Sequence, residues 1–294
     1  MSDLSFWATM LLNGLSIGSA YALFAVGLAI IFGVARVVNF AHGDFYMIGG
    51  YLAVFAAGGL GLGFWGGMVV STLGLAVLGL VAYYLLFRRF INNSRAEMAI
   101  VSTLGLGLML QYGVLEFAGG DARRLETSMT SRTVSLGLAD ISLARLMVIG
   151  LSAVAIASLA MWLRWSRSGR AIRAISQSRE AAEVVGISAD RMSALAITVG
   201  LGLAGVAAAA LTPMYGVFPF VGQVLVMKAF AIVVLAGFGS LPGTAVAALG
   251  VGLAESIAGG LGSAALQNSA AFIILIIALV LRPQGLFGKG VRVA

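Results

Sequence analysis

The chain has 294 residues, of which 61% are hydrophobic and only 10% are charged, and its formal net charge is +7. Soluble globular proteins carry about 25% charged residues, so this composition excludes a single water-soluble core and indicates a polytopic membrane protein. Cysteine is absent, which excludes disulfides and thiolate metal sites. Positive charge in such a chain fits basic cytoplasmic loops, so we expect a lipid membrane and no nucleic acid as a partner.

Nine apolar segments of roughly helix length follow one another along the chain. They cover residues 7–34, 45–59, 64–87, 98–117, 144–163, 192–211, 221–237, 244–259 and 266–281. A membrane-spanning helix needs about 20 residues, so the short segments 45–59 and 244–259 are candidates for re-entrant helices. We predict an all-α polytopic membrane protein with about eight to ten helical membrane segments, some of them broken, forming a single transmembrane domain over residues 1–294.

A polar break over residues 36–44 separates the first two apolar segments. It contains Arg36, Asn39, His42 and Asp44, and Tyr46 follows directly. Non-helical backbone at membrane depth is tolerated only inside protein or along a water-filled cavity, so the break is a candidate part of a transport pathway. The alternative is that its charged residues lie at an interface, solvated and paired, and only set the helix ends.

The second half of the chain repeats this pattern. A polar break over residues 237–243, containing Gly237, Gly239 and Pro242, separates two apolar runs, and a weaker third example covers residues 211–219. Interrupted segments at corresponding places in two halves point to internally repeated transporter folds. Lys228 and Glu255 lie within the flanking apolar runs, and we expect them to form an ion pair.

The basic residues predict the orientation of the chain. Twelve of them would lie on one side and four on the other, and the larger group should be cytoplasmic. The larger group is Arg88, Arg89, Arg95, Arg164, Arg167, Arg170, Arg173, Arg179, Arg191, Arg282, Lys289 and Arg292, and the smaller is Arg123, Arg124, Arg132 and Arg145. Loop 164–191 and the C-terminus are then cytoplasmic, and nine full crossings would place the N-terminus outside.

Loop 164–191 has the sequence of a short capped helix. Ser178 is a good N-cap with Glu180 in the favourable first turn, and Gly186 is a stop signal. Ala181, Val184 and Val185 would share one face. Two interpretations remain open: a basic loop lying on lipid headgroups, or a helix that docks on a cytoplasmic partner.

The sequence contains no G-x-x-x-x-G-K-[ST] phosphate loop, so we do not expect this chain to hydrolyse ATP through that motif. His42 is the only histidine, which argues against a His-rich metal site. We therefore expect no catalytic residue and no cofactor in this chain. A secondary transporter, a channel or a membrane enzyme remain alternatives at this point.

Four motifs give the chain a family resemblance. It closely resembles the first of the two permeases of branched-chain amino acid ABC importers, in the high-affinity hydrophobic amino acid uptake family. The motifs are Asn13-Gly-Leu-Ser-Ile-Gly18 with Tyr21, Asn39-Phe-Ala-His42-Gly-Asp44, residues 228–243, and Leu281-Arg-Pro-Gln-Gly-Leu-Phe287-Gly. The resemblance implies a type II-like importer permease with two related halves in a bacterial inner membrane.

The resemblance also implies partners and site residues. The partners would be a second homologous permease, two ATPase subunits that hold ATP and Mg²⁺, and a periplasmic or lipid-anchored solute-binding protein. The E-A-A…G pattern implies that loop 164–191 couples to the ATPases through Arg173, Ser178, Glu180, Ala181, Ala182 and Gly186. Candidates for the translocation pathway are Asn13, Asn39, His42, Asp44, Tyr46, Lys228, Gly237, Gly239, Pro242 and Glu255.

The substrate is less well defined than the family. Relatives of this kind carry Leu, Ile or Val, whereas others carry urea, short-chain amides or aromatic acids. The solute-binding protein sets most of the selectivity in such importers, so the permease sequence alone leaves these substrates open.

Overall fold

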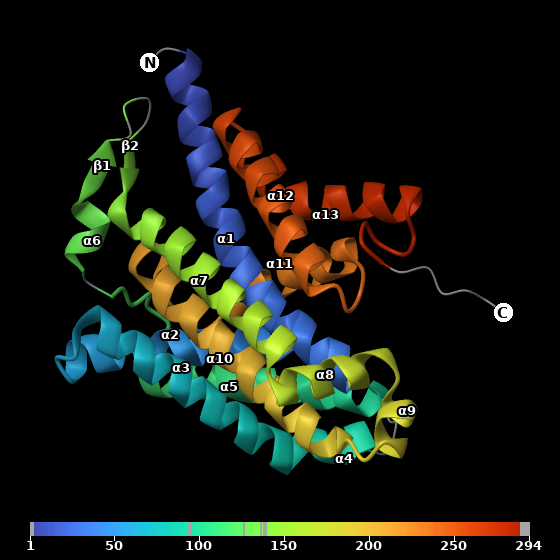
Figure 1. The fold of residues 1–294 in the computed structure, drawn as a ribbon. Coiled ribbons are helices and arrows are strands. Elements are labelled where there is room, and N and C mark those ends of the chain that lie inside the picture. Colours follow the sequence, from blue (N-terminus) through green and yellow to red (C-terminus); the bar gives the residue numbers. More distant parts are fainter. Residues whose placement is uncertain (1–2, 93–95, 126, 136, 138–139, 289–294) are drawn as a thin grey trace.

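The protein is a bundle of long helices with two small non-membrane elements at opposite ends (Figure 1). The computed structural model describes residues 3–92, 96–125, 127–135, 137 and 140–288, so Arg95, Lys289 and Arg292 lie outside the described residues. Each of the nine predicted apolar segments forms a helix. They are α1 (Asp3–Ala35), α2 (His42–Val54), α3 (Gly63–Ala82), α5 (Ala96–Ala118), α7 (Leu143–Trp165), α10 (Ala189–Tyr215), α11 (Val221–Ala236), α12 (Leu241–Gly260) and α13 (Ala264–Leu281).

Within the described residues, seven helices are long and apolar enough to cross a membrane. The two exceptions are α2 and α11. A π-helical turn over Phe55–Gly59 continues α2, and another over Tyr83–Phe87 joins α3 to α4 (Arg88–Asn92). The prediction of an all-α polytopic permease with broken helices is therefore confirmed.

The two longest predicted loops form the small elements at the ends of the bundle. One end carries α6 (Ser128–Ser131) and an antiparallel hairpin of β1 (Thr133–Ser135) and β2 (Asp140–Ser142), with Val134 opposite Ile141. The other end carries α8 (Arg167–Gln177) and α9 (Arg179–Val184). We call these the hairpin end and the α9 end. Figure 1 shows α1 beginning at the hairpin end and finishing near α8.

The prediction of a short segment at 244–259 was wrong. Ser240 accepts a hydrogen bond from the Gly243 backbone N–H at 3.2 Å, and this cap starts α12 at Leu241. Pro242 therefore lies in the first turn of a 20-residue helix. Proline is tolerated there because backbone N–H groups of the first turn have no intrahelical partner, so the N–H that proline lacks is not missed. The break predicted over residues 237–243 therefore covers only residues 237–240. The short helix of the second half is α11, which precedes this break, and not α12.

The counterpart of the first break also differs from the prediction. In the first half, the long helix α1 is followed by a break and the short helix α2. In the second half, the long helix α10 is followed by a break over residues 216–220 and the short helix α11. This second break overlaps the weaker third example predicted from the sequence, residues 211–219. The packing supports this match, because α12 packs along α1 as α3 packs along α10. A serine donates to a backbone carbonyl in each pair: Ser256 to Met10 at 2.7 Å, and Ser71 to Gly205 at 2.9 Å.

The two halves run in opposite directions. Figure 1 shows α1 running from the hairpin end to the α9 end, whereas α10 begins after α9 and runs back towards the hairpin end, so α10 is antiparallel to α1. Transporters with such inverted repeats place their broken helices at the interface between the halves. Here α2 packs against α11 at that interface.

Glycine pairs allow the halves to approach backbone to backbone. A Cβ on Gly43 would lie 2.2 Å from the Gly222 carbonyl oxygen, and a Cβ on Gly222 would lie 2.1 Å from the Gly43 oxygen. Gly27 of α1 and Gly200 of α10 show the same reciprocal contact. Small residues permit such close crossings in membranes, where the two helices gain packing energy rather than a hydrophobic driving force.

A buried ion pair ties α1, α11 and α12 together, as the sequence predicts. Lys228 Nζ lies 2.9 Å from Glu255 Oε1, and the two side chains are 8% and 2% exposed. The Tyr21 hydroxyl donates to Glu255 Oε2 at 2.8 Å and accepts from Lys228 Nζ at 3.1 Å. This arrangement satisfies both charges inside the protein.

We expect Gly43→Ala and Gly222→Ala each to destabilise the fold by about 1–3 kcal/mol, because the added methyl group meets backbone atoms that cannot rotate away. Thermal unfolding of the purified protein in detergent measures the effect. Gly150→Ala on α7 is the control, since nothing lies within 4 Å of its Cβ position. Wild-type melting of both crossing variants would contradict the proposed contact.

We expect Lys228→Met to destabilise the protein by about 3 kcal/mol, because it leaves the Glu255 carboxylate buried without its cation. The double variant Lys228→Met/Glu255→Gln should recover part of this loss. The same thermal unfolding assay separates the two cases. Equal melting of the single and double variants would show that the unpaired Glu255 carboxylate is not the cause of the destabilisation.

Candidate functional site

The α9 end presents a helix formed by the caps that the sequence predicts. The Ser178 side chain accepts from the Ala181 backbone N–H at 3.3 Å, and the Ser188 side chain caps α10 in the same way. Gly186 has φ +83°, a left-handed conformation that favours glycine, and it ends the connection after α9. Glu180 and Ala181 are exposed, whereas Ala182 is buried against the bundle.

The exposed face of α9 is apolar at its tip. Val184 is 87% exposed and Val185 is 73% exposed. These side chains lie at the end of the bundle rather than along its flanks, in a loop that also carries several arginines. An apolar tip between charged residues leaves both earlier interpretations of the loop possible, a contact with lipid headgroups or with a cytoplasmic partner.

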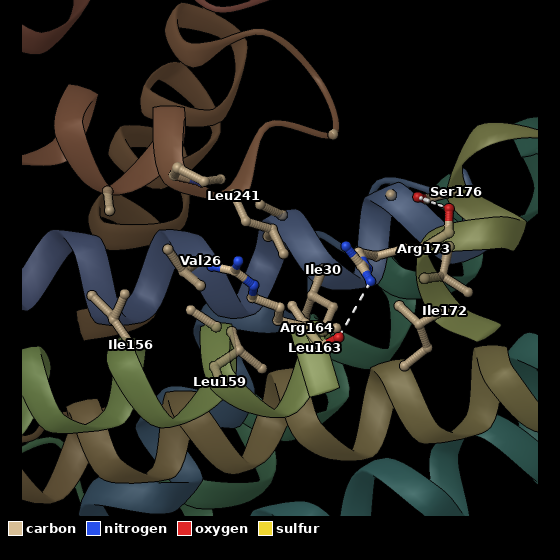
Figure 2. Close-up of a pocket in the computed structure, with 17 residues that line it drawn as sticks. Val26, Ile30, Ile156, Leu159, Leu163, Arg164, Ile172, Arg173, Ser176 and Leu241 are labelled. Atoms are coloured by element: carbon tan, nitrogen blue, oxygen red, sulfur yellow. Dashed lines mark hydrogen bonds between the residues drawn. The ribbon is translucent and has the colours of Figure 1, made fainter. Parts of the chain in front are cut away.

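A pocket of about 560 Å³ joins the α8 helix to the turn between α11 and α12. Arg173 of α8 lines it together with Gly239, Pro242 and residues of α1 and α7. Figure 2 shows the Arg164 and Arg173 side chains beside Val26 and Ile30 of α1, with an Arg173 nitrogen donating to the Arg164 carbonyl. The structure therefore brings together residues that the sequence places in two separate sites, coupling and break.

The first break ends earlier than predicted, because α2 begins at His42. Asn39 of this break and His42 and Tyr46 of α2 lie in the core rather than along a described pocket. Asn39, His42 and Tyr46 are 2%, 0% and 3% exposed. Phe24 covers two of them, with ring centroids 4.6 Å from His42 and 5.5 Å from Tyr46. Their assignment to the translocation pathway stays a prediction, and their present surroundings are those of side chains that brace the break.

Asp44, in the first turn of α2, faces a cavity. It lines a groove of about 610 Å³ between α2, α5, α11 and α13. Gln111 Nε2 donates to Asp44 Oδ1 at 2.6 Å, and Gln223 Nε2 donates to Gln111 Oε1 at 3.0 Å. Gln223 was not predicted from the sequence. In the sequence it stands out only as a single amide residue in the first turn of an apolar helix. Its spacing from Asp44 does not indicate that the two residues lie close together.

The remaining predicted residues lie elsewhere. Asn13 of α1 accepts a hydrogen bond from Arg145 of α7, near the hairpin end. Lys228 and Glu255 are enclosed in their ion pair. Gly237 ends α11 with φ +89°, where a Cβ would lie 2.6 Å from the Gly288 nitrogen, so this position needs glycine for conformation and for space.

Comparisons with known proteins agree with this architecture over nearly the whole chain. Residues 10–281 match the family model described as branched-chain amino acid transport system / permease component. The chain is 31% identical to the high-affinity branched-chain amino acid transport system permease protein LivH of Escherichia coli K12, covering 97% of this chain and 96% of LivH. It is 30% identical to the corresponding protein BraD of Pseudomonas aeruginosa, covering 98% of each. The chain therefore belongs to the family of branched-chain amino acid transport permeases.

Proposed function

We propose that this chain is the translocation subunit of an ATP-driven importer for Leu, Ile and Val, and that it is not itself an enzyme. The observation that carries the proposal is the exposed, capped α9 helix at one end of a membrane permease of this family. The apolar tip outside the membrane segments offers a contact surface for a partner subunit that supplies the energy. The choice of substrate is supported by the relatives, which are named as permeases of branched-chain amino acid transport systems.

The proposed assembly contains a second, homologous permease, two ABC ATPase subunits and a periplasmic or lipid-anchored solute-binding protein. ATP and Mg²⁺ would be held by the ATPases, with no cofactor in this chain. Helix α9, with Glu180, Ala181 and the two exposed valines, is the contact that we assign to an ATPase. The same loop carries several arginines that would pair with acidic groups of the partner.

The proposed orientation places the α9 end and the C-terminus in the cytoplasm of a bacterial inner membrane. The arginines of loop 164–191 support it, because basic residues collect on the cytoplasmic side. The hairpin end then faces outward, where a solute-binding protein delivers its ligand.

The proposed mechanism is alternating access driven from α9. Closure of the ATPases would displace α8 and α9, and the pocket containing Arg173, Gly239 and Pro242 would pass this displacement to α1 and the α11–α12 turn. The inverted halves would then rearrange about their broken helices. Solute would move between the two permease subunits.

We expect Glu180→Lys and Gly186→Leu to uncouple the transporter. The first reverses a charge on the contact face, and the second strains a left-handed turn, so ATP-driven leucine uptake in proteoliposomes should fall at least about tenfold while membrane insertion persists. Glu97→Lys is the control, because this exposed carboxylate lies in the first turn of α5, near the same end but outside the loop. Normal uptake in both loop variants, or failure of an ATPase pair to copurify with the wild type, would refute the coupling assignment.

The absence of native cysteine allows a direct test of orientation. We expect Val185→Cys on the α9 end to react with a membrane-impermeant maleimide only after cells are permeabilised. Ser135→Cys in β1 should react in intact cells, since this residue is exposed at the hairpin end. Labelling with the opposite pattern would invert the proposed topology.

A further inference from the structure

Asp44 carries a buried carboxylate that forms no ion pair with a described residue. Its side chain is 5% exposed, and its hydrogen-bond donor is the neutral amide of Gln111. Among the described residues, no Lys or Arg forms an ion pair with it. The other carboxylate buried in the bundle, Glu255, is neutralised by Lys228. A carboxylate removed from water without a cation costs free energy, and a ligand that brings the cation recovers it.

The surroundings hold the Asp44 carboxylate in place through its Oδ1. Gln223 donates to the Gln111 carbonyl oxygen, which turns the Gln111 NH₂ group toward Asp44 Oδ1. Asp44 also lies in the first turn of α2, where the helix dipole favours a negative charge. A Cβ on Gly107 would lie 2.2 Å from Oδ2, so a glycine at this position keeps the space that this oxygen occupies.

The rest of the groove is apolar. Its walls include Leu104 and Leu108 of α5 with Val224 and Met227 of α11, and these four side chains are 44–64% exposed, so the groove is open on this side. The volume of about 610 Å³ is ample for a small aliphatic molecule. A single anionic point beside branched aliphatic walls matches a ligand with one ammonium group and an aliphatic body.

We propose that Asp44 binds the α-ammonium group of the transported aliphatic amino acid, whose side chain lies along the Leu104, Leu108 and Met227 wall. This inference rests on the proposed function and makes the permease a second point of substrate selection after the solute-binding protein. It favours neutral amino acids and amines over anionic acids, because a carboxylate in the same groove would meet Asp44 with like charge.

The test is ligand-observed NMR on the intact permease–ATPase complex in nanodiscs, without the solute-binding protein. The probes are L-leucine, isoamylamine, which lacks the carboxylate, and 4-methylpentanoate, which lacks the ammonium group. We expect the first two to bind the wild type at least about tenfold more tightly than 4-methylpentanoate, the loss expected for a charged hydrogen bond. Asp44→Asn should abolish this difference.

Glu116→Gln removes an exposed carboxylate from the same helix as Gln111 and should leave all three affinities unchanged. Leu108→Trp, at an exposed wall position, should block leucine without altering Asp44, and it serves if Asp44→Asn folds poorly. No leucine binding to the wild type, equal binding of leucine and 4-methylpentanoate, or unchanged discrimination in Asp44→Asn would each overturn the inference. Copurification of the ATPases separates these outcomes from failure of the proposed function, which predicts that copurification whatever Asp44 binds.

Discussion

The fold depends on enclosing the polar backbone of two helix breaks inside a membrane protein. Hydrocarbon offers no hydrogen-bond partner, so each N–H and C=O of a break needs one within the chain. In the first break the Phe40 N–H donates to Thr103 Oγ1 at 3.3 Å. In the break over residues 216–220, Val217 and Arg123 exchange two backbone hydrogen bonds of 2.8 and 2.9 Å. Helix α5 and the loop after it thus serve both breaks, and the crossing at Gly43 and Gly222 closes the space between them.

Hydropathy and capping chemistry predict much of this fold from the sequence. All nine apolar segments form helices, and Ser178 and Ser188 cap the helices that follow them, because these signals act over a few neighbouring residues. The sequence could not identify which breaks correspond. Residues 237–243 are richer in glycine and proline than 216–220, yet Ser240 starts a full-length helix there. Correspondence is a property of how α1, α3, α10 and α12 pack, and local composition does not encode it.

The candidate site divides in the same way. The proposed coupling residues lie within one stretch of chain, residues 173–186, so their pattern is visible in the sequence. The Asp44 cluster joins residues 67 and 112 positions apart, through two amides that are unremarkable on their own helices. His42 and Asp44 are two residues apart in sequence but differ in role here: α2 turns the imidazole toward Phe24 and the carboxylate toward the groove.

Helix α11 connects the two ends of the proposed mechanism. Its 16 residues span about 24 Å, so the helix reaches from one cavity to the other. Its C-terminus runs into the turn containing Gly239, which lines the pocket with Arg173, and its N-terminus carries Gln223, which orients the amide on Asp44. Lys228 anchors its middle to Glu255, so α11 is held by α12 and α1 while both of its ends remain at cavities. A displacement of α8 that tilts α11 about this anchor would therefore withdraw Gln223 from Gln111 and weaken the hold on the Asp44 carboxylate. Coupling and substrate release would then be two consequences of one rigid-body movement.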